Sequence, residues 1–146
     1  FNVYGPNQNP DSQYAAVIPR FIKCGLAKQK PTIFGDGSQT RDFIFVKDAV
    51  KANLLAAKSK VNDGQAINIA CQKKLSINDL LKAINNVTRQ STKPKYAAAR
   101  RGDIKDSLAD ISLAKKLLGY KPDFGLEQGL KHTIRHFSET YTRKQK

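Results

Sequence analysis

The chain opens with FNVYGP, residues 1–6, in which a short strand over residues 2–4 is expected to end at the Gly-Pro pair. After a polar loop, apolar residues recur at helical spacing and predict a helix over residues 15–27. Pro19 fits the first turn of this helix, where a missing amide hydrogen costs little. The chain therefore begins with a strand, a loop and a helix, as α/β proteins do.

The same alternation of strands and helices continues along the chain. Further strands are predicted over residues 32–34, 41–46, 65–70 and 95–98. Further helices are predicted from Asp48 to about Ser59, from Ile77 to Val87 behind a capping box at Ser76, from Ile111 to Leu118 between Asp110 and Gly119, and from Leu126 to Tyr141. The strands are too few and too separated for a full doubly wound sheet, so we expect part of a larger α/β unit.

Length and composition limit the class of protein. With 146 residues, 40% of them hydrophobic, the chain is long enough for one modest core. No apolar run approaches the ~20 residues that span a bilayer, so we expect no membrane partner. Cys24 and Cys71 lie among apolar residues of a predicted helix and strand, which is typical of reduced core thiols in a cytoplasmic protein.

A net charge of +14 raises the question of nucleic-acid binding. The basic residues are scattered, and aromatic residues are not interleaved with them as base-stacking surfaces require. Two denser basic stretches, residues 89–105 and 142–146, are interpreted as basic surface and as a solvated helix end. We therefore expect no nucleic-acid partner.

His132 and His136 are four residues apart on the last predicted helix, a spacing that zinc ligands can use. The glutamate of a metalloprotease motif does not lie between them, and the sequence offers no convincing third ligand. We interpret both as helix-surface residues and expect no metal.

Five segments in a fixed order resemble one enzyme family. They are FNVYGPNQNP (1–10), YAAVIPRF (14–21), IFGDGSQTRDFIFVKD (33–48), RRGDIKDSLAD (100–110) and LLGYKPDF (117–124). Together they resemble the substrate-binding half of extended short-chain dehydrogenases of the NAD-dependent epimerase/dehydratase family, most of all the UDP-N-acetylglucosamine 4-epimerases. The resemblance implies an extended Rossmann-type α/β fold, of which this chain supplies the C-terminal portion, a small mixed sheet with helices.

The sequence lacks what the family's first half supplies. No spacing of its nine glycines gives the Gly-x-x-Gly-x-x-Gly turn that approaches the pyrophosphate of NAD, and no tyrosine is followed by lysine four residues later. We therefore expect residues 1–146 to be a C-terminal substrate-binding region that contains no catalytic residue and is inactive alone. An NAD-binding domain would precede Phe1. The chain also has no methionine, although removal of an initiator methionine or a tag would explain that equally.

The resemblance assigns a diphosphate site. Arg41 and Arg100 match the two family arginines that grip the diphosphate, and guanidinium groups suit phosphate oxygens. The amides of Ala16 and Val17 match the helix start that lies close to it. Without the resemblance, the two arginines would be surface charges and the two apolar residues core contacts.

The resemblance also assigns the two ends of the substrate. The main chain of Thr32 and Phe34 matches the strand that reads uracil, which would otherwise be an ordinary edge strand. Asp103 matches the aspartate that holds the ribose hydroxyls; alternatively it is a partner for Arg100 or a turn residue. Asn2 matches a contact to the sugar or phosphate, and Phe1 the edge of the nicotinamide site.

Ser107 bears on the choice of sugar. It occupies the position where relatives restricted to UDP-glucose and UDP-galactose can have a large tyrosine, and a small residue there accompanies acceptance of N-acetylated sugars. Its alternative interpretation is a loop serine before a helix.

The resemblance implies that the intact enzyme is an NAD-dependent, cytoplasmic and homodimeric UDP-sugar 4-epimerase. We expect it to interconvert UDP-N-acetylglucosamine and UDP-N-acetylgalactosamine, with UDP-glucose and UDP-galactose as poorer substrates. A related sugar-nucleotide dehydratase or decarboxylase is the first alternative. A stand-alone nucleotide-binding or basic interaction module is the second.

Overall fold

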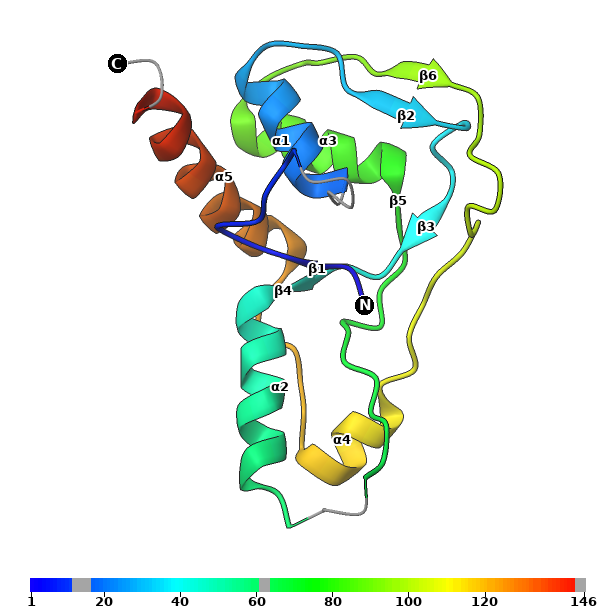
Figure 1. The fold of residues 1–146 in the computed structure, drawn as a ribbon, viewed down its shortest axis with the longest axis vertical. Coiled ribbons are helices and arrows are strands. Elements are labelled where there is room, and N and C mark those ends of the chain that lie inside the picture. Colours follow the sequence, from blue (N-terminus) through cyan, green and yellow to red (C-terminus); the bar gives the residue numbers. More distant parts are fainter. Residues whose placement is uncertain (12–16, 61–63, 144–146) are drawn as a thin grey trace.

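The computed structural model describes residues 1–11, 17–60 and 64–143, and its helices form two groups (Figure 1). The helices are α1 (Val17–Leu26), α2 (Val46–Lys58), α3 (Ile77–Thr88), α4 (Ser112–Leu118) and α5 (Leu126–Arg143). Helices α1, α3 and α5 pack on one another in one group, and α2 packs on α4 in the other. Of the described helices, none combines the length and apolarity that crossing a membrane requires.

The described residues also form six short strands. They are β1 (Val3–Tyr4), β2 (Thr32–Phe34), β3 (Thr40–Arg41), β4 (Ile44–Phe45), β5 (Leu75–Ser76) and β6 (Lys95–Ala97). β1 pairs with β4 and β2 with β6, both in parallel, whereas β3 pairs antiparallel with β5. The α/β class is thus confirmed, but the described strands form three two-stranded sheets in place of the single small mixed sheet that was expected.

Each helix group has its own hydrophobic core. The larger core joins the apolar faces of α1, α3 and α5 to Tyr4 and Phe45, whose rings lie 5.6 Å apart. The smaller core lies between α2 and α4 and is centred on Ile44, Ala114 and Tyr120, which are at most 1% exposed. Because β4 contributes Phe45 to the larger core and Ile44 to the smaller one, it links the two groups.

The strand predicted over residues 41–46 is interrupted at Asp42, and this has a physical cause. Asp42 is fully buried, and its carboxylate accepts hydrogen bonds from the backbone N–H groups of Cys71 (3.1 Å) and Gln72 (2.8 Å). The segments on either side then pair with different partners, β3 with β5 and β4 with β1. The next helix begins at Val46, earlier than the predicted Asp48.

Asp48 forms a second buried connection. This side chain is also fully buried, in the first turn of α2, and it accepts from the backbone N–H groups of Asp123 (2.9 Å) and Phe124 (3.2 Å). A carboxylate in the first turn of a helix is favoured by the helix dipole. Asp48 therefore fastens the start of α2 to the segment that leads into α5.

The prediction of a strand over residues 65–70 is wrong. The structure has no regular element there, although Ile67 and Ile69 are half-buried and Asn68 between them is exposed. A strand needs a neighbour to complete its hydrogen-bond ladder, and no described strand pairs with this segment. Cys71 consequently lies outside any strand, as a free, half-buried thiol.

The predicted helix ends are mostly confirmed. The Ser76 hydroxyl accepts from the Asp79 N–H (3.0 Å), as a capping box requires, and Gly119 ends α4 at φ +61°. At the start of α4 the N-cap is Ile111, while the carboxylate of Asp110 accepts from the Ser112 N–H (2.8 Å). Asp110 thus satisfies a helix-start donor from one residue outside the cap.

Candidate functional site

A cleft of about 700 Å³ lies between α1, β2, β3 and the loop around residues 100–103. Seven of the predicted site residues line it: Asn2, Val17, Thr32, Phe34, Arg41, Arg100 and Asp103. Ala16 falls outside the described residues, while Phe1 and Ser107 are not among the described residues that line the cleft. The sequence thus identified residues from several separate segments that the fold brings together.

The cleft has an excess of positive charge. Among the described residues that line it, four carry cationic side chains and two carry carboxylates: Arg20, Lys23, Arg41 and Arg100, against Asp11 and Asp103. Cationic groups in a cleft raise the local concentration of anions. The described wall therefore favours an anionic ligand.

Arg41 is held in a defined orientation. Its guanidinium group pairs with the Asp103 carboxylate (2.5 Å) and donates to the Thr40 carbonyl oxygen (2.7 Å), and its side chain is only 16% exposed. The sequence had allowed Asp103 to pair with Arg100; the structure pairs it with Arg41 instead. One face of the cleft thus carries a planar cation whose position is fixed before any ligand binds.

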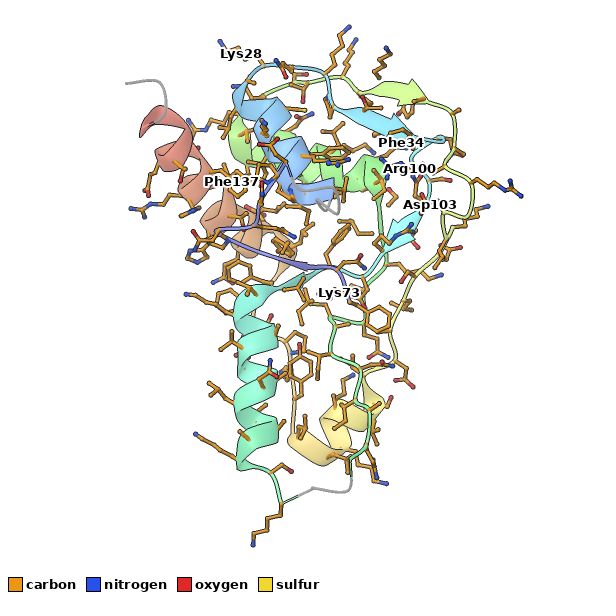
Figure 2. All side chains as sticks on the ribbon, viewed as in Figure 1. Lys28, Phe34, Lys73, Arg100, Asp103 and Phe137 are labelled. Carbon is orange, nitrogen blue, oxygen red and sulfur yellow. The ribbon has the colours of Figure 1, made fainter. Side chains whose placement is uncertain are left out.

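Arg100 makes a different contact. Its guanidinium carbon lies 3.9 Å from the centroid of the Phe34 ring, a cation–π geometry, and Figure 2 shows Phe34, Arg100 and Asp103 close together. No ion pair joins Arg100 to a described carboxylate. Its hydrogen-bond donors therefore remain available to an anion in the cleft.

The strand β2 presents a free backbone edge to the cleft. The Pro31 carbonyl accepts from the Lys95 N–H and the Gly35 N–H donates to the Ala97 carbonyl, each over 2.9 Å, so these groups face β6. Backbone groups of successive strand residues point to opposite edges. The N–H and C=O groups of Thr32 and Phe34 therefore face away from β6, where no described strand pairs with them.

The first two residues differ in how they are held. Asn2 has a positive φ of 28° and lines the cleft, and one side-chain N–H donates to the Asp42 carbonyl (3.0 Å), while no described residue donates to its amide oxygen. Phe1 is 45% exposed, with its amino group 3.4 Å from the Ile69 carbonyl oxygen. The amide nitrogen of Asn2 therefore holds the main chain at Asp42, whereas its amide oxygen can accept a hydrogen bond from another group.

Ser107 lies beside the cleft. Its backbone N–H donates to the Thr40 carbonyl (3.1 Å), and the neighbouring Asp106 accepts from the Thr40 hydroxyl (2.6 Å). Both bonds reach the residue next to Arg41. Ser107 is therefore half-buried and fixed close to the cleft wall, although it does not line it.

The thiols and imidazoles offer no evident chemistry. Burial raises the pKa of Cys24, which lines the cleft, and raises the pKa of Cys71 to about 11, so both thiols are protonated at neutral pH. His132 stacks on Phe45 with 5.8 Å between ring centroids. Within the described residues, no group of three or more potential ligands is placed to hold a metal ion.

Gln39 and Arg20 are among the cleft residues that the sequence interpretation missed. Gln39 donates from its side-chain amide to the Phe34 carbonyl (2.7 Å), and Arg20 faces the cleft from α1. Both residues lie inside segments that carry the family resemblance. The resemblance therefore pointed to these segments, but not to these two residues. A polar residue after a turn and a cation on a helix have no spacing pattern that marks them as site residues.

Comparisons with known proteins agree with this geometry. The family model described as "NAD dependent epimerase/dehydratase family" matches residues 1–70, which include β1 to β4, α1 and α2. A UDP-N-acetyl-alpha-D-glucosaminuronate decarboxylase of Bacillus cytotoxicus is 37% identical over 95% of this chain and 44% of its own length. Residues 1–70 therefore carry a domain of the NAD-dependent epimerase/dehydratase family. The chain spans less than half the length of this relative.

Solved structures of the family extend the match to the whole fold. A UDP-N-acetylglucosamine 4-epimerase from Methanobrevibacter ruminantium, in complex with UDP-N-acetylmuramic acid, superimposes with a TM-score of 0.91 at 45% identity. A UDP-glucuronic acid 4-epimerase from Bacillus cereus, in complex with UDP-glucuronic acid and NAD, superimposes with a TM-score of 0.89 at 35% identity. The matches cover 96% and 97% of this chain and 44% of each of those chains, and they fall on the C-terminal part of such epimerases.

The family is NAD-dependent, but the described residues do not form a dinucleotide site. The sequence has no Gly-x-x-Gly-x-x-Gly turn, and the two glycines of Gly35-x-Gly37 belong to the turn after β2. Phe1, the predicted nicotinamide neighbour, is largely exposed, and its amino group contacts the main chain of Ile69. The described residues therefore line a cationic cleft and supply no pyrophosphate turn for NAD.

Proposed function

We propose that this chain is the UDP-sugar-binding part of an NAD-dependent 4-epimerase that interconverts UDP-N-acetylglucosamine and UDP-N-acetylgalactosamine. The observation that carries the proposal is the convergence of Arg41, Arg100, Asp103 and the free edge of β2 in one cleft. The 45% identity to a protein described as a UDP-N-acetylglucosamine 4-epimerase supports this choice of sugar.

Each group in the cleft has a distinct task in this proposal. The free edge of β2 pairs with the uracil ring through Thr32 and Phe34, and Asp103 accepts hydrogen bonds from the ribose. Arg41 and Arg100 neutralise the diphosphate with charge-assisted hydrogen bonds. The nucleotide is thereby gripped firmly while the hexose, directed toward Asn2, is left free to turn.

NAD is proposed as the cofactor of the natural protein, held mainly by residues outside this chain. The family's NAD dependence and the NAD present in the Bacillus cereus structure support this. A homodimeric state and a cytoplasmic location remain predictions from the sequence resemblance.

A sugar-nucleotide decarboxylase is the second candidate, because a relative with that description is 37% identical. Arg20, a cation that lines the cleft, is compatible with a sugar that carries a carboxylate. The two reactions differ in their products: an epimerase inverts one carbon and keeps every atom, whereas a decarboxylase releases CO₂.

The function is tested on the natural full-length protein with NAD. UDP-N-acetylglucosamine and the corresponding UDP-uronate are supplied separately, and the products are identified by NMR. The proposal expects UDP-N-acetylgalactosamine from the first substrate. Consumption of the uronate alone, with CO₂ release, would establish the second candidate, and no turnover of either would refute both.

Ser107→Tyr is expected to change the preference among sugars in the full-length protein. Overpacking costs about 1–3 kcal/mol, so kcat/KM for acetylated UDP-hexoses should fall about 5- to 150-fold relative to UDP-glucose. The reason is that the backbone bond to Thr40 fixes Ser107 beside Arg41, so a larger side chain has to use space near the cleft. Ser107→Ala is the matched control and should preserve the ratio. If Ser107→Tyr also preserves it, Ser107 does not control sugar choice.

A further inference from the structure

The side chain of Gln39 forms a hydrogen bond with the edge of β2 that faces away from β6. Its amide nitrogen donates to the Phe34 carbonyl over 2.7 Å, and it lines the same cleft as Thr32 and Phe34. The second N–H of this amide and its oxygen have no partner among the described residues. A primary amide with unused hydrogen-bonding groups thus lies at one end of the edge proposed to bind the base.

The position of Gln39 is fixed from several directions. Its carbonyl accepts from the Ile77 N–H at the start of α3 (3.1 Å), and the next residue, Thr40, pairs with Ser76 in β5. The turn before it is closed by the Asp36 carboxylate, which accepts from both the N–H and the hydroxyl of Ser38. The amide is therefore placed by rigid neighbours, as a recognition group needs to be.

The order of groups along the free edge determines what Gln39 would face. This order is the Thr32 carbonyl, the Phe34 N–H and then the Phe34 carbonyl, which Gln39 already occupies. A uracil that donates its N3–H to Thr32 and accepts at O4 from Phe34 turns its C4–C5 side toward the Gln39 amide. This step rests on the proposed function, because it takes a uridine nucleotide as the ligand.

We propose that Gln39 is a specificity-determining residue that reads position 4 of the pyrimidine. Its unused N–H donates a second hydrogen bond to O4 of uracil, beside the bond from the Phe34 N–H. Cytosine carries an amino group at this position, so two protein donors would face a third donor. Polar groups left unpaired in a binding site discriminate strongly between otherwise similar ligands. Gln39 therefore favours uridine over cytidine nucleotides.

The test compares UDP with 4-thio-UDP, in which sulfur, a weak hydrogen-bond acceptor, replaces O4. Dissociation constants are measured by calorimetry for the natural full-length protein and its Gln39→Leu variant. We expect the wild type to prefer UDP about tenfold, and the variant to lose at least about threefold of this preference, the scale of one hydrogen bond. The preference for UDP over CDP should fall in the same variant.

The control separates this role from a structural one. Gln29→Leu makes the same chemical change in the same cleft, at a glutamine whose side chain has no hydrogen bond among the described residues, and should leave both ratios unchanged. If Gln39 only braces Phe34, Gln39→Leu will weaken UDP and 4-thio-UDP equally, and the inference is overturned. If the wild type binds no UDP, the proposed function itself fails; UDP binding with unchanged ratios refutes only the role of Gln39.

Discussion

Replacing Asp42 with alanine is expected to lower the free energy of unfolding by about 2–4 kcal/mol. The fully buried carboxylate accepts two backbone hydrogen bonds, from Cys71 and Gln72. Each bond to a charged group contributes roughly 1.5–3 kcal/mol, and release from the cost of burying the charge offsets part of the loss. Urea unfolding of the full-length protein measures the effect.

A matched control separates the effect of burial on stability from the effect of the number of hydrogen bonds. The exposed carboxylate of Asp110 also accepts two bonds, both from Ser112, but water replaces it when it is removed. Asp110→Ala should therefore destabilise the protein markedly less than Asp42→Ala. Equal losses from the two variants would show that the burial of Asp42 adds nothing to the stability that its two hydrogen bonds to residues 71 and 72 provide.

The elements that the sequence predicted correctly depend on local signals. Helix α3 has a capping box at Ser76 and an apolar face that continues to Val87, and both features lie within the helix itself. Gly119 likewise ends α4 where it was expected, because a left-handed conformation favours glycine. Such signals need no knowledge of distant contacts.

The elements that were predicted incorrectly depend on partners far along the chain. Residues 41–46 have the composition of one strand, but Asp42 is drawn to backbone groups about thirty residues away and divides the segment. Within residues 65–70 only Ile67, Asn68 and Ile69 alternate between half-buried and exposed positions, and no described strand pairs with the segment. Pairing, unlike periodicity, is not encoded in a single segment.

The same distinction applies to the site. The resemblance singled out Arg41, Arg100 and Asp103, and the structure places all three at one cleft. Which arginine pairs with Asp103 is decided by the fold, and it is Arg41. The role proposed for Gln39 depends on the hydrogen bond from its amide to the Phe34 carbonyl across a turn. The family motifs thus selected residues that the fold brings to one cleft, whereas tertiary contacts determine which of these residues pair with each other.

Because Asp103 pairs with Arg41 and not with Arg100, we expect the two arginines to contribute unequally to the binding of an anion. Arg41 is neutralised by Asp103 and mostly buried, so a ligand gains only part of its charge. Arg100 is exposed and rests on the Phe34 ring, without a carboxylate partner among the described residues. A diphosphate is therefore expected to gain more from Arg100 than from Arg41.

Arg100→Ala in the full-length protein should weaken UDP binding by about 1.5–3 kcal/mol, or roughly 10- to 150-fold in Kd. The loss should be smaller for UMP, because a single phosphate offers the guanidinium group fewer oxygens to bind. Titration of wild type and variant with UDP, UMP and UDP-sugar provides the comparison. Arg101→Ala removes the same charge one residue away, from a side chain that does not line the cleft, and should change Kd little. Equal UDP affinities for wild type and Arg100→Ala would mean that the diphosphate is not held by Arg100, and the proposed orientation of the nucleotide in the cleft would have to be abandoned.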